Sequence, residues 1–116
     1  MMIKNMFEIP AQPVVMEGAS NVTVRVLIGP QDQAPTFAMR LFEAAPSGHT
    51  PFHAHDFEHE VIVLEGDVAL VTDDGEIPLK PNDVLLVAPN ERHQFKNCSD
   101  TNPARFICLV PIAYQT

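Results

Sequence analysis

The feature that most constrains the fold of this chain is how often turn-forming residues interrupt it. Eleven prolines and five glycines recur at intervals of roughly eight to twelve residues, a spacing typical of the short strands of a β-sandwich or barrel. No long segment keeps the period of an amphipathic helix. At 116 residues, the chain can build one hydrophobic core and is too short for two domains. We therefore expect a single all-β domain.

Short runs of β-branched and apolar residues give the positions of the strands. The predicted strands are Val22–Ile28, Thr36–Ala44, His59–Leu64, Asp67–Thr72, Glu76–Leu79, Asp83–Val87, His93–Lys96 and Arg105–Val110. Turn signals such as "APSG", "DDG" and "KPND" separate them. We expect a barrel over 22–112 and an N-terminal arm over 1–13, whose apolar residues could pack on a second subunit.

The charge of the chain excludes several classes of partner. The formal net charge is −8, with only seven lysines and arginines, so we expect neither nucleic acid nor an anionic membrane surface as a partner. No apolar run reaches the length of a membrane span, and the first residues do not resemble a secretory signal. We expect a cytoplasmic protein, in which Cys98 and Cys108 are free thiols.

The segment "HAHDFEHE" holds an unusual concentration of histidines directly before an apolar strand. His53 and His55 are two residues apart and would leave the same face of a strand, with His59 at the same parity. His93 opens a later strand, and His49 is read as an ordinary surface residue. Neutral imidazole is the commonest metal ligand in proteins, whereas a solvated surface does not explain four histidines placed in this way. We predict a metal site formed by His53, His55, His59 and His93.

The type of ligand limits the choice of metal. The HExxH signature of zinc proteases is absent, and no cysteine pair offers a closed structural zinc site. Imidazoles alone suit Zn, Cu, Ni or Fe, and Mn is compatible where cellular supply decides. We expect Asp56, Glu58 and Glu60 to be exposed or to accept hydrogen bonds from the ligating rings, and not to bind the metal.

Strand parity places further side chains near these histidines. Val61 lies on the face of His59, and Phe95 lies on the face of His93. Arg40 is the only charged residue in "TFAMRLF". It points either to solvent, as arginines usually do, or into the pocket, where it would anchor an anionic substrate. Of the two, we favour the pocket.

Two segments resemble the metal motifs of the cupins, a superfamily of small β-barrels. The first is "GHTPFHAHDFEHEVIVLEG", in which His53 and His55 match the first two ligands of the family. Six residues separate His59 from Gly66, which puts His59 at the position that the family usually gives to glutamate. The second is "NDVLLVAPNERHQFKN", in which His93 and Asn97 match the family pattern.

The second motif departs from the family at two positions. Asn82 and Asn90 replace its two glycines. Asparagine also tolerates a positive φ, so we expect both turns to form.

The resemblance covers nearly the whole chain and is closest to small single-domain cupins with four histidines. It implies a double-stranded β-helix, or jelly roll, and a homodimer with exchanged N-terminal strands. It implies a divalent metal, with Mn or Fe favoured and Zn, Ni or Cu as further choices. The resemblance also implies that one face of the last strand points towards the metal. The predicted pocket residues are then Arg40, Val61, Phe95, Phe106, Cys108 and Val110.

Three functions are compatible with such a site. A dioxygenase-type oxidoreductase acting on a small anionic or enolisable molecule is the leading prediction. The alternatives are a redox-neutral isomerase or lyase that uses the metal as a Lewis acid, and a non-enzymatic module that binds or senses a small molecule. No serine or cysteine nucleophile system stands out, so catalytic side chains stay unassigned and the chemistry is expected to centre on the metal.

Overall fold

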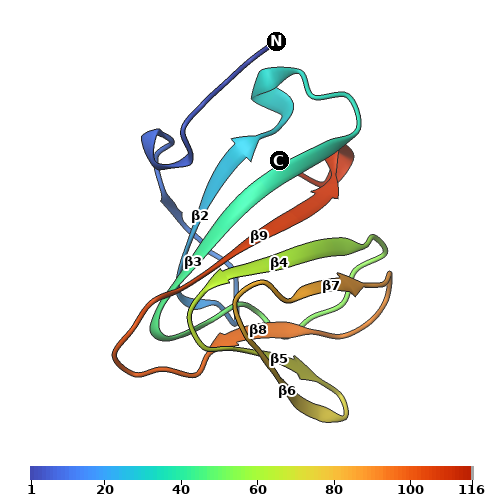
Figure 1. The fold of residues 1–116 in the computed structure, drawn as a ribbon. Helices are drawn as coiled ribbons and strands as arrows, with labels where there is room; N and C mark the ends of the chain where they lie inside the picture. Colours follow the sequence, from blue (N-terminus) through green and yellow to red (C-terminus); the bar gives the residue numbers. More distant parts are fainter. Residues whose placement is uncertain (116) are drawn as a thin grey trace.

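The computed structural model describes residues 1–115, and its strands form one antiparallel sheet that curls on itself (Figure 1). The predicted single-domain jelly-roll barrel is confirmed. The strands are β1 (Gln12–Pro13), β2 (Ser20–Ile28), β3 (Phe37–His49), β4 (His59–Glu65), β5 (Val68–Thr72), β6 (Gly75–Leu79), β7 (Val84–Val87), β8 (Gln94–Asn97) and β9 (Ala104–Pro111). Three short 3₁₀ helices are η1 (Met6–Glu8), η2 (Pro30–Asp32) and η3 (Ile112–Tyr114).

The order of the strands explains how distant segments reach one site. The sheet runs β6-β5-β8-β3-β9-β4-β7, with β2 paired to β3 and β1 paired to β2. β3 and β8 share a single register pair, His49 with Lys96, and the sheet turns there. In Figure 1, β2, β3, β9 and β4 lie side by side in one layer, and β8, β5 and β6 lie below them. The concave side of the curled sheet is therefore lined by residues from both halves of the chain.

β3 is the strand that differs most from the prediction. It continues through the predicted "APSG" turn to His49, five residues beyond Ala44. The pairing with β2 is irregular here, because Ser20 pairs with His49 and Val22 with Ala44. Ser47 adopts a left-handed φ of 63° within this irregular stretch. A bulge of this kind accommodates a proline inside a strand, so the turn composition did not end the strand.

The turns of the two motifs adopt the expected conformations. Asn82 has a φ of 77° and Asn90 a φ of 69°, so both replace glycine in the left-handed region as predicted. Gly66 has a φ of 98°, and a Cβ there would lie 2.7 Å from the Ala104 Cα atom. This glycine lets the chain pass close to the start of β9.

The core lies between the two layers and is built mainly from alternating residues of the strands. The pattern is clearest in β9, where every second side chain is buried. The buried apolar cluster consists of Val22, Ala38, Ala44, Val61, Val63, Val68, Val87, Phe95, Ala104, Phe106, Cys108 and Val110. Three of these side chains, Phe95, Phe106 and Cys108, also line the cavity described below.

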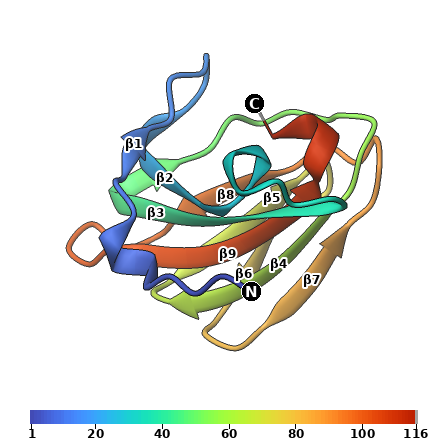
Figure 2. The ribbon, with the colours of Figure 1, turned by 90° about the horizontal axis from the view of Figure 1, so that it is seen from above.

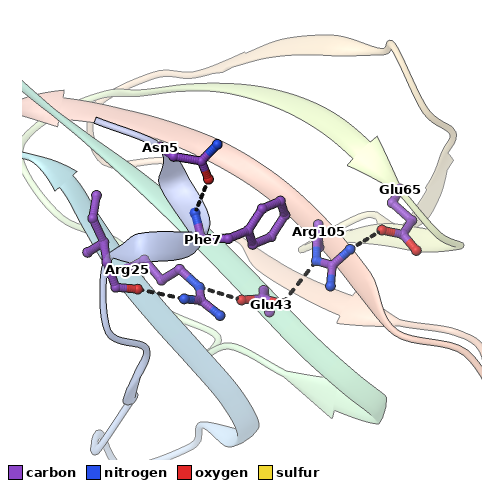
Figure 3. Close-up of polar contacts among 7 residues, drawn as sticks. Asn5, Phe7, Arg25, Glu43, Glu65 and Arg105 are labelled. Carbon is purple, nitrogen blue, oxygen red and sulfur yellow. Dashed lines mark hydrogen bonds and ion pairs between the residues drawn. The ribbon is translucent and has the colours of Figure 1, made fainter. Parts of the chain in front are cut away.

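The N-terminal arm packs along β2 of its own chain. Arg25 of β2 donates to the Ile9 carbonyl and to the carboxylate of Glu43. Arg105 of β9 also donates to Glu43, so that one carboxylate joins two strands (Figure 3). The Phe7 ring lies over both guanidinium groups, 5.7 Å and 5.4 Å from their Cζ atoms. Exchange of this arm between two subunits stays a prediction.

The other end of the chain returns towards the histidine segment. η3 follows β9 and lies beside the segment that leads from β3 to β4 (Figure 2). The ring of Tyr114 stacks on Phe57 with centroids 4.0 Å apart. Within residues 1–115, the helices are too short to cross a membrane.

Candidate metal centre and its cavity

Backbone pairing brings the two histidine motifs together. His53 and His93 form an isolated β-bridge, with N–O distances of 3.1 Å and 2.9 Å between their backbone groups. His55 follows in the loop, and His59 begins β4. The bridge fixes residues 40 positions apart in the sequence at one end of the barrel.

The four imidazole rings form one cluster. The centroids of His53 and His93 are 5.2 Å apart, and that of His55 lies 5.1 Å and 5.0 Å from them. His59 packs against His55 at 4.4 Å and against His93 at 5.2 Å. One ligating nitrogen of each of His53, His55 and His93 lies within 4.8 Å of the others, whereas His59 stands outside this tighter group.

Hydrogen bonds fix how two of the rings are oriented. His55 Nδ1 lies 2.9 Å from the Phe57 carbonyl oxygen, and His93 Nδ1 lies 2.8 Å from that of Glu91. A carbonyl can only accept, so Nδ1 carries the proton in both rings and Nε2 keeps its lone pair. The Nε2 atom of His55 is buried and has no hydrogen-bond partner. A buried nitrogen in this state is poised to bind a cation.

The acidic residues of the segment take no part in orienting the rings. Asp56, Glu58 and Glu60 are all exposed. The outer acceptors of His55 and His93 are backbone carbonyls. Backbone carbonyl groups therefore orient the rings of His55 and His93.

Burial favours the neutral form of His53, His59 and His93. It lowers the pKa of His59 to about 3, with further lowering by the nearby Arg40 guanidinium and by the other histidines. Burial is also the main cause that lowers the pKa of His53 and of His93. Loss of water penalises the charged imidazolium, and neutral imidazole is the form that binds metals. The environment thus favours the protonation state that a metal site needs.

The histidines line a cavity of about 350 Å³. The described lining residues are Val14, Met16, Arg40, Phe42, Thr50, Pro51, His53, His55, Phe57, His59, His93, Phe95, Phe106, Cys108, Tyr114 and Gln115. None of the lining residues described is an aspartate or a glutamate. A larger groove of about 580 Å³ lies elsewhere, over β4 and β7, and contains no histidine.

Four of the six predicted pocket residues line this cavity: Arg40, Phe95, Phe106 and Cys108. Val61 and Val110 do not line it and are packed in the hydrophobic core. Both have the inward parity that the sequence indicates. Parity separates the inward face of a strand from the outward one, but it does not separate the core from the cavity wall.

Cys108 links the arginine to the histidine cluster. Its Sγ atom lies 3.2 Å from Arg40 Nη2 and 3.2 Å from His59 Nδ1. Burial raises the pKa of this thiol, although the Arg40 guanidinium acts in the opposite direction. Cys98 is the other free cysteine; it is exposed and is not among the described residues that line the cavity.

Sequence reasoning missed the aromatic stack at the mouth of the cavity. The rings of His55 and Phe57 are parallel, with centroids 3.9 Å apart. The ring of Tyr114 also stacks on Phe57. Phe57 could have been noticed, because it lies between two predicted ligands. Tyr114 follows the last strand in a short 3₁₀ helix, and no periodic pattern marks it.

Comparison with solved structures finds similar chains of several named activities. The polyketide cyclase RemF from Streptomyces resistomycificus is 32% identical with a TM-score of 0.91, over 97% of this chain and 80% of that one. A sugar phosphate isomerase of the cupin superfamily from Silicibacter pomeroyi is 24% identical with a TM-score of 0.80, over 92% and 73% of the two chains. A predicted oxalate decarboxylase from Thermotoga maritima is 19% identical with a TM-score of 0.83, over 96% and 99%.

The last two similarities concern the fold alone. No curated protein matches the chain. The family model described as "Cupin domain" matches residues 40–110, which contain both histidine motifs and more than half of the chain. The predicted family is confirmed, and the chain belongs to the cupins.

Proposed function

We propose that this protein binds a divalent metal through His53, His55, His59 and His93 and acts on a small enolisable molecule in the adjoining cavity. The observation that carries the proposal is the buried Nε2 atom of His55, which has no hydrogen-bond partner and lies within a cluster of four imidazoles. Without a cation, this nitrogen would be a desolvated acceptor with no hydrogen bond, which is rare in a folded protein.

The donor set fits a metal better than it fits a structural role. His53, His55 and His93 already place ligating nitrogens within 4.8 Å of one another. The ring of His59 packs on His55 and His93, so it is the proposed fourth ligand. Imidazole donors suit iron, zinc, nickel and copper, and manganese is compatible where supply decides. We keep Mn and Fe as the favoured metals because the four-histidine resemblance implies them.

A bound divalent cation would polarise a carbonyl oxygen as a Lewis acid or, if it were Fe or Mn, support oxygen chemistry. We propose the redox-neutral reaction first, with ring closure of a carbonyl-rich chain as the specific form. The support is the 32% identity to a polyketide cyclase over 97% of this chain. This order differs from the oxygenase that the sequence favoured.

The side chains of the cavity fit the handling of an enolate. Arg40 supplies a positive charge at the histidine cluster. Phe95 and Phe106 lie close together in the wall, with centroids 4.7 Å apart, and exclude water from the reacting carbon atoms. The lining residues described here hold no carboxylate that could act as a general base. The lack of such a base is what keeps the dioxygenase as the second candidate.

The first experiment measures metal content by inductively coupled plasma mass spectrometry on protein purified without chelator or added metal. We expect about one equivalent per chain in the wild type, and a loss of most of it in His55→Ala and in His93→Ala. Glu60→Gln is the matched control, because Glu60 lies in the same segment but is exposed. Full metal content in both histidine variants would refute the site.

The reaction class is tested by supplying the metal-loaded protein, under air and under argon, with an enolisable β-diketone whose chain carries further carbonyl groups placed for ring closure. A redox-neutral enzyme consumes it at the same rate in both atmospheres, with no uptake of O₂. Consumption only under air, matched by O₂ uptake, would assign the oxygenase instead. Binding of the diketone without turnover in either atmosphere would leave the binding module.

A further inference from the structure

We infer that Arg40 is the anion anchor of the cavity and that its ligand is a planar conjugated molecule carrying a carboxylate or an enolate. This inference deepens the proposed function, because it names the class of substrate for the same site. It depends on Arg40 and its surroundings, and it can be tested whether or not a metal is bound.

The hydrogen bonds of Arg40 are incomplete. It lies near the start of β3 and pairs with Val26 of β2 on one side and with Cys108 of β9 on the other. Its Nη2 atom donates to Cys108 Sγ at 3.2 Å, and its Cζ atom lies 4.8 Å from the centroid of the Phe42 ring. Its Nε atom is buried and has no partner. A thiol sulfur is a weak acceptor, so the guanidinium keeps donors without good acceptors.

The charge of Arg40 has no counter-ion among residues 1–115. The other three arginines each form an ion pair, Arg25 and Arg105 with Glu43 and Arg92 with Asp73. Arg40 forms none among these residues, although the whole chain carries a net charge of −8. A desolvated cation without a partner is costly. An anionic ligand would complete the fork of donors that the protein leaves open.

The walls next to Arg40 are flat. Phe42, on which its guanidinium lies, stacks on Phe106 with centroids 5.3 Å apart and planes 15° apart. Phe106 in turn packs on Phe95 at 4.7 Å. Aromatic faces of this kind favour a planar conjugated ligand over a compact saturated one. The cavity of about 350 Å³ has room for a fused ring system.

The position of Cys108 ties the anchor to the proposed metal site. Its sulfur contacts both Arg40 Nη2 and His59 Nδ1 at 3.2 Å. An anion held by Arg40 therefore lies beside the histidine cluster, where an enolate oxygen would be needed. The same contact makes Cys108 a positioning residue for the guanidinium.

The test uses 2-naphthoate and 2-naphthamide, two flat ring systems that differ in charge, with affinities measured by isothermal titration calorimetry. The wild-type protein is expected to prefer the carboxylate. Arg40→Gln should weaken 2-naphthoate binding roughly tenfold to hundredfold, the usual effect of losing a hydrogen bond between charged groups, and should leave 2-naphthamide nearly unchanged. Arg40→Lys retains the charge without the planar fork of donors, so its affinity for 2-naphthoate should lie between those of the wild type and Arg40→Gln.

Arg92→Gln is the matched control. The Cζ atom of Arg92 lies 4.5 Å from the centroid of the Phe52 ring, as Arg40 lies over Phe42, but Arg92 is on the exposed surface. The Arg92→Gln variant should bind both probes like the wild type. All measurements are made on protein as purified and again after metal removal, with folding checked by circular dichroism. If the wild-type protein binds no metal, the proposed metal site is wrong. The preference of the metal-free protein for the carboxylate is still expected in that case, so the two proposals can fail separately.

Three results would overturn the role of Arg40. One is equal affinity of the wild type for both probes, and another is no binding of either. The third is a carboxylate preference that survives in Arg40→Gln or, should that variant not fold, in full strength in Arg40→Lys. A preference found only in the metal-loaded protein and unchanged by both substitutions would assign the anion to the metal.

Discussion

Asn97 is a buried amide that holds three segments together. Only 2% of its surface is exposed. Its Nδ2 atom donates to the carbonyl oxygens of Ala44, Ala45 and Asn102, and its Oδ1 atom accepts from the Ser99 backbone amide. The last asparagine of the second motif thus ties β8 to β3 and to the turn before β9.

We predict that Asn97→Asp destabilises the protein by about 2–4 kcal/mol. A carboxylate cannot donate to the three carbonyl oxygens, and they would face a buried negative charge instead. Urea unfolding measures the change, and Asn102→Asp on the exposed turn is the control, expected within about 0.5 kcal/mol. Equal stability of the wild type and Asn97→Asp would show that the amide makes no net contribution.

At this scale, spacing indicated which histidines would gather but not how their rings would be held. His53, His55, His59 and His93 were found from parity, from the later motif and from the family resemblance. The hydrogen bonds of His55 and His93 go to backbone carbonyls, which no side-chain pattern reveals. The separation of His59 from the tighter group of three depends on ring packing, which the sequence does not encode locally.

Among the elements, the strands were the most predictable part of the fold. Their alternation and the turn residues between them depend on neighbouring residues only, so positions such as Asp67–Thr72 against the observed Val68–Thr72 agree closely. β1 was not predicted, because two residues carry no periodic signal and pair only through β2. The C-terminal η3, which brings Tyr114 to the cavity, depends on a tertiary contact with Phe57.

Phe7 is one of the residues that hold the N-terminal arm to the barrel. Phe7 caps the guanidinium groups of Arg25 and Arg105, while the Asn5 side chain accepts from the Phe7 amide at 3.0 Å (Figure 3). We predict that Phe7→Ala speeds hydrogen exchange around η1 (Met6–Glu8) and leaves β4 and β9 unchanged. Two cation–π contacts, each about 0.5–1 kcal/mol at an exposed site, are lost together.

Ile3→Ala is the control for this prediction, because the Ile3 side chain is 89% exposed. Exchange of the arm is followed by mass spectrometry, with molar mass measured by light scattering on the same samples. If Phe7→Ala leaves exchange in the arm unchanged, something other than these contacts holds it. A fall in molar mass would connect the arm to the predicted homodimer.

Across the whole molecule, Glu43 is the carboxylate that joins the arm, β2, β3 and β9. Burial alone would raise the pKa of Glu43, but hydrogen bonds from Arg25 and Arg105 outweigh it, and its pKa lies below the usual 4.5. The unfolded chain therefore binds a proton at this site more readily than the folded chain. The stabilisation by Glu43 is complete above about pH 4.5 and is lost as the pH falls through the lower folded pKa.

We predict that Glu43→Gln lowers the free energy of unfolding by about 1–3 kcal/mol at neutral pH, because two charged hydrogen bonds are weakened. The deficit should shrink below about pH 4.5, since the wild-type carboxylate is then progressively protonated as well. Urea unfolding over this pH range tests the effect on metal-free protein, in which both variants share the same histidine titrations. Glu76→Gln removes an exposed ion pair with Lys96 and should change stability by less than about 0.5 kcal/mol throughout. A deficit of constant size at every pH would mean that shape, and not charge, is what Glu43 contributes to this network.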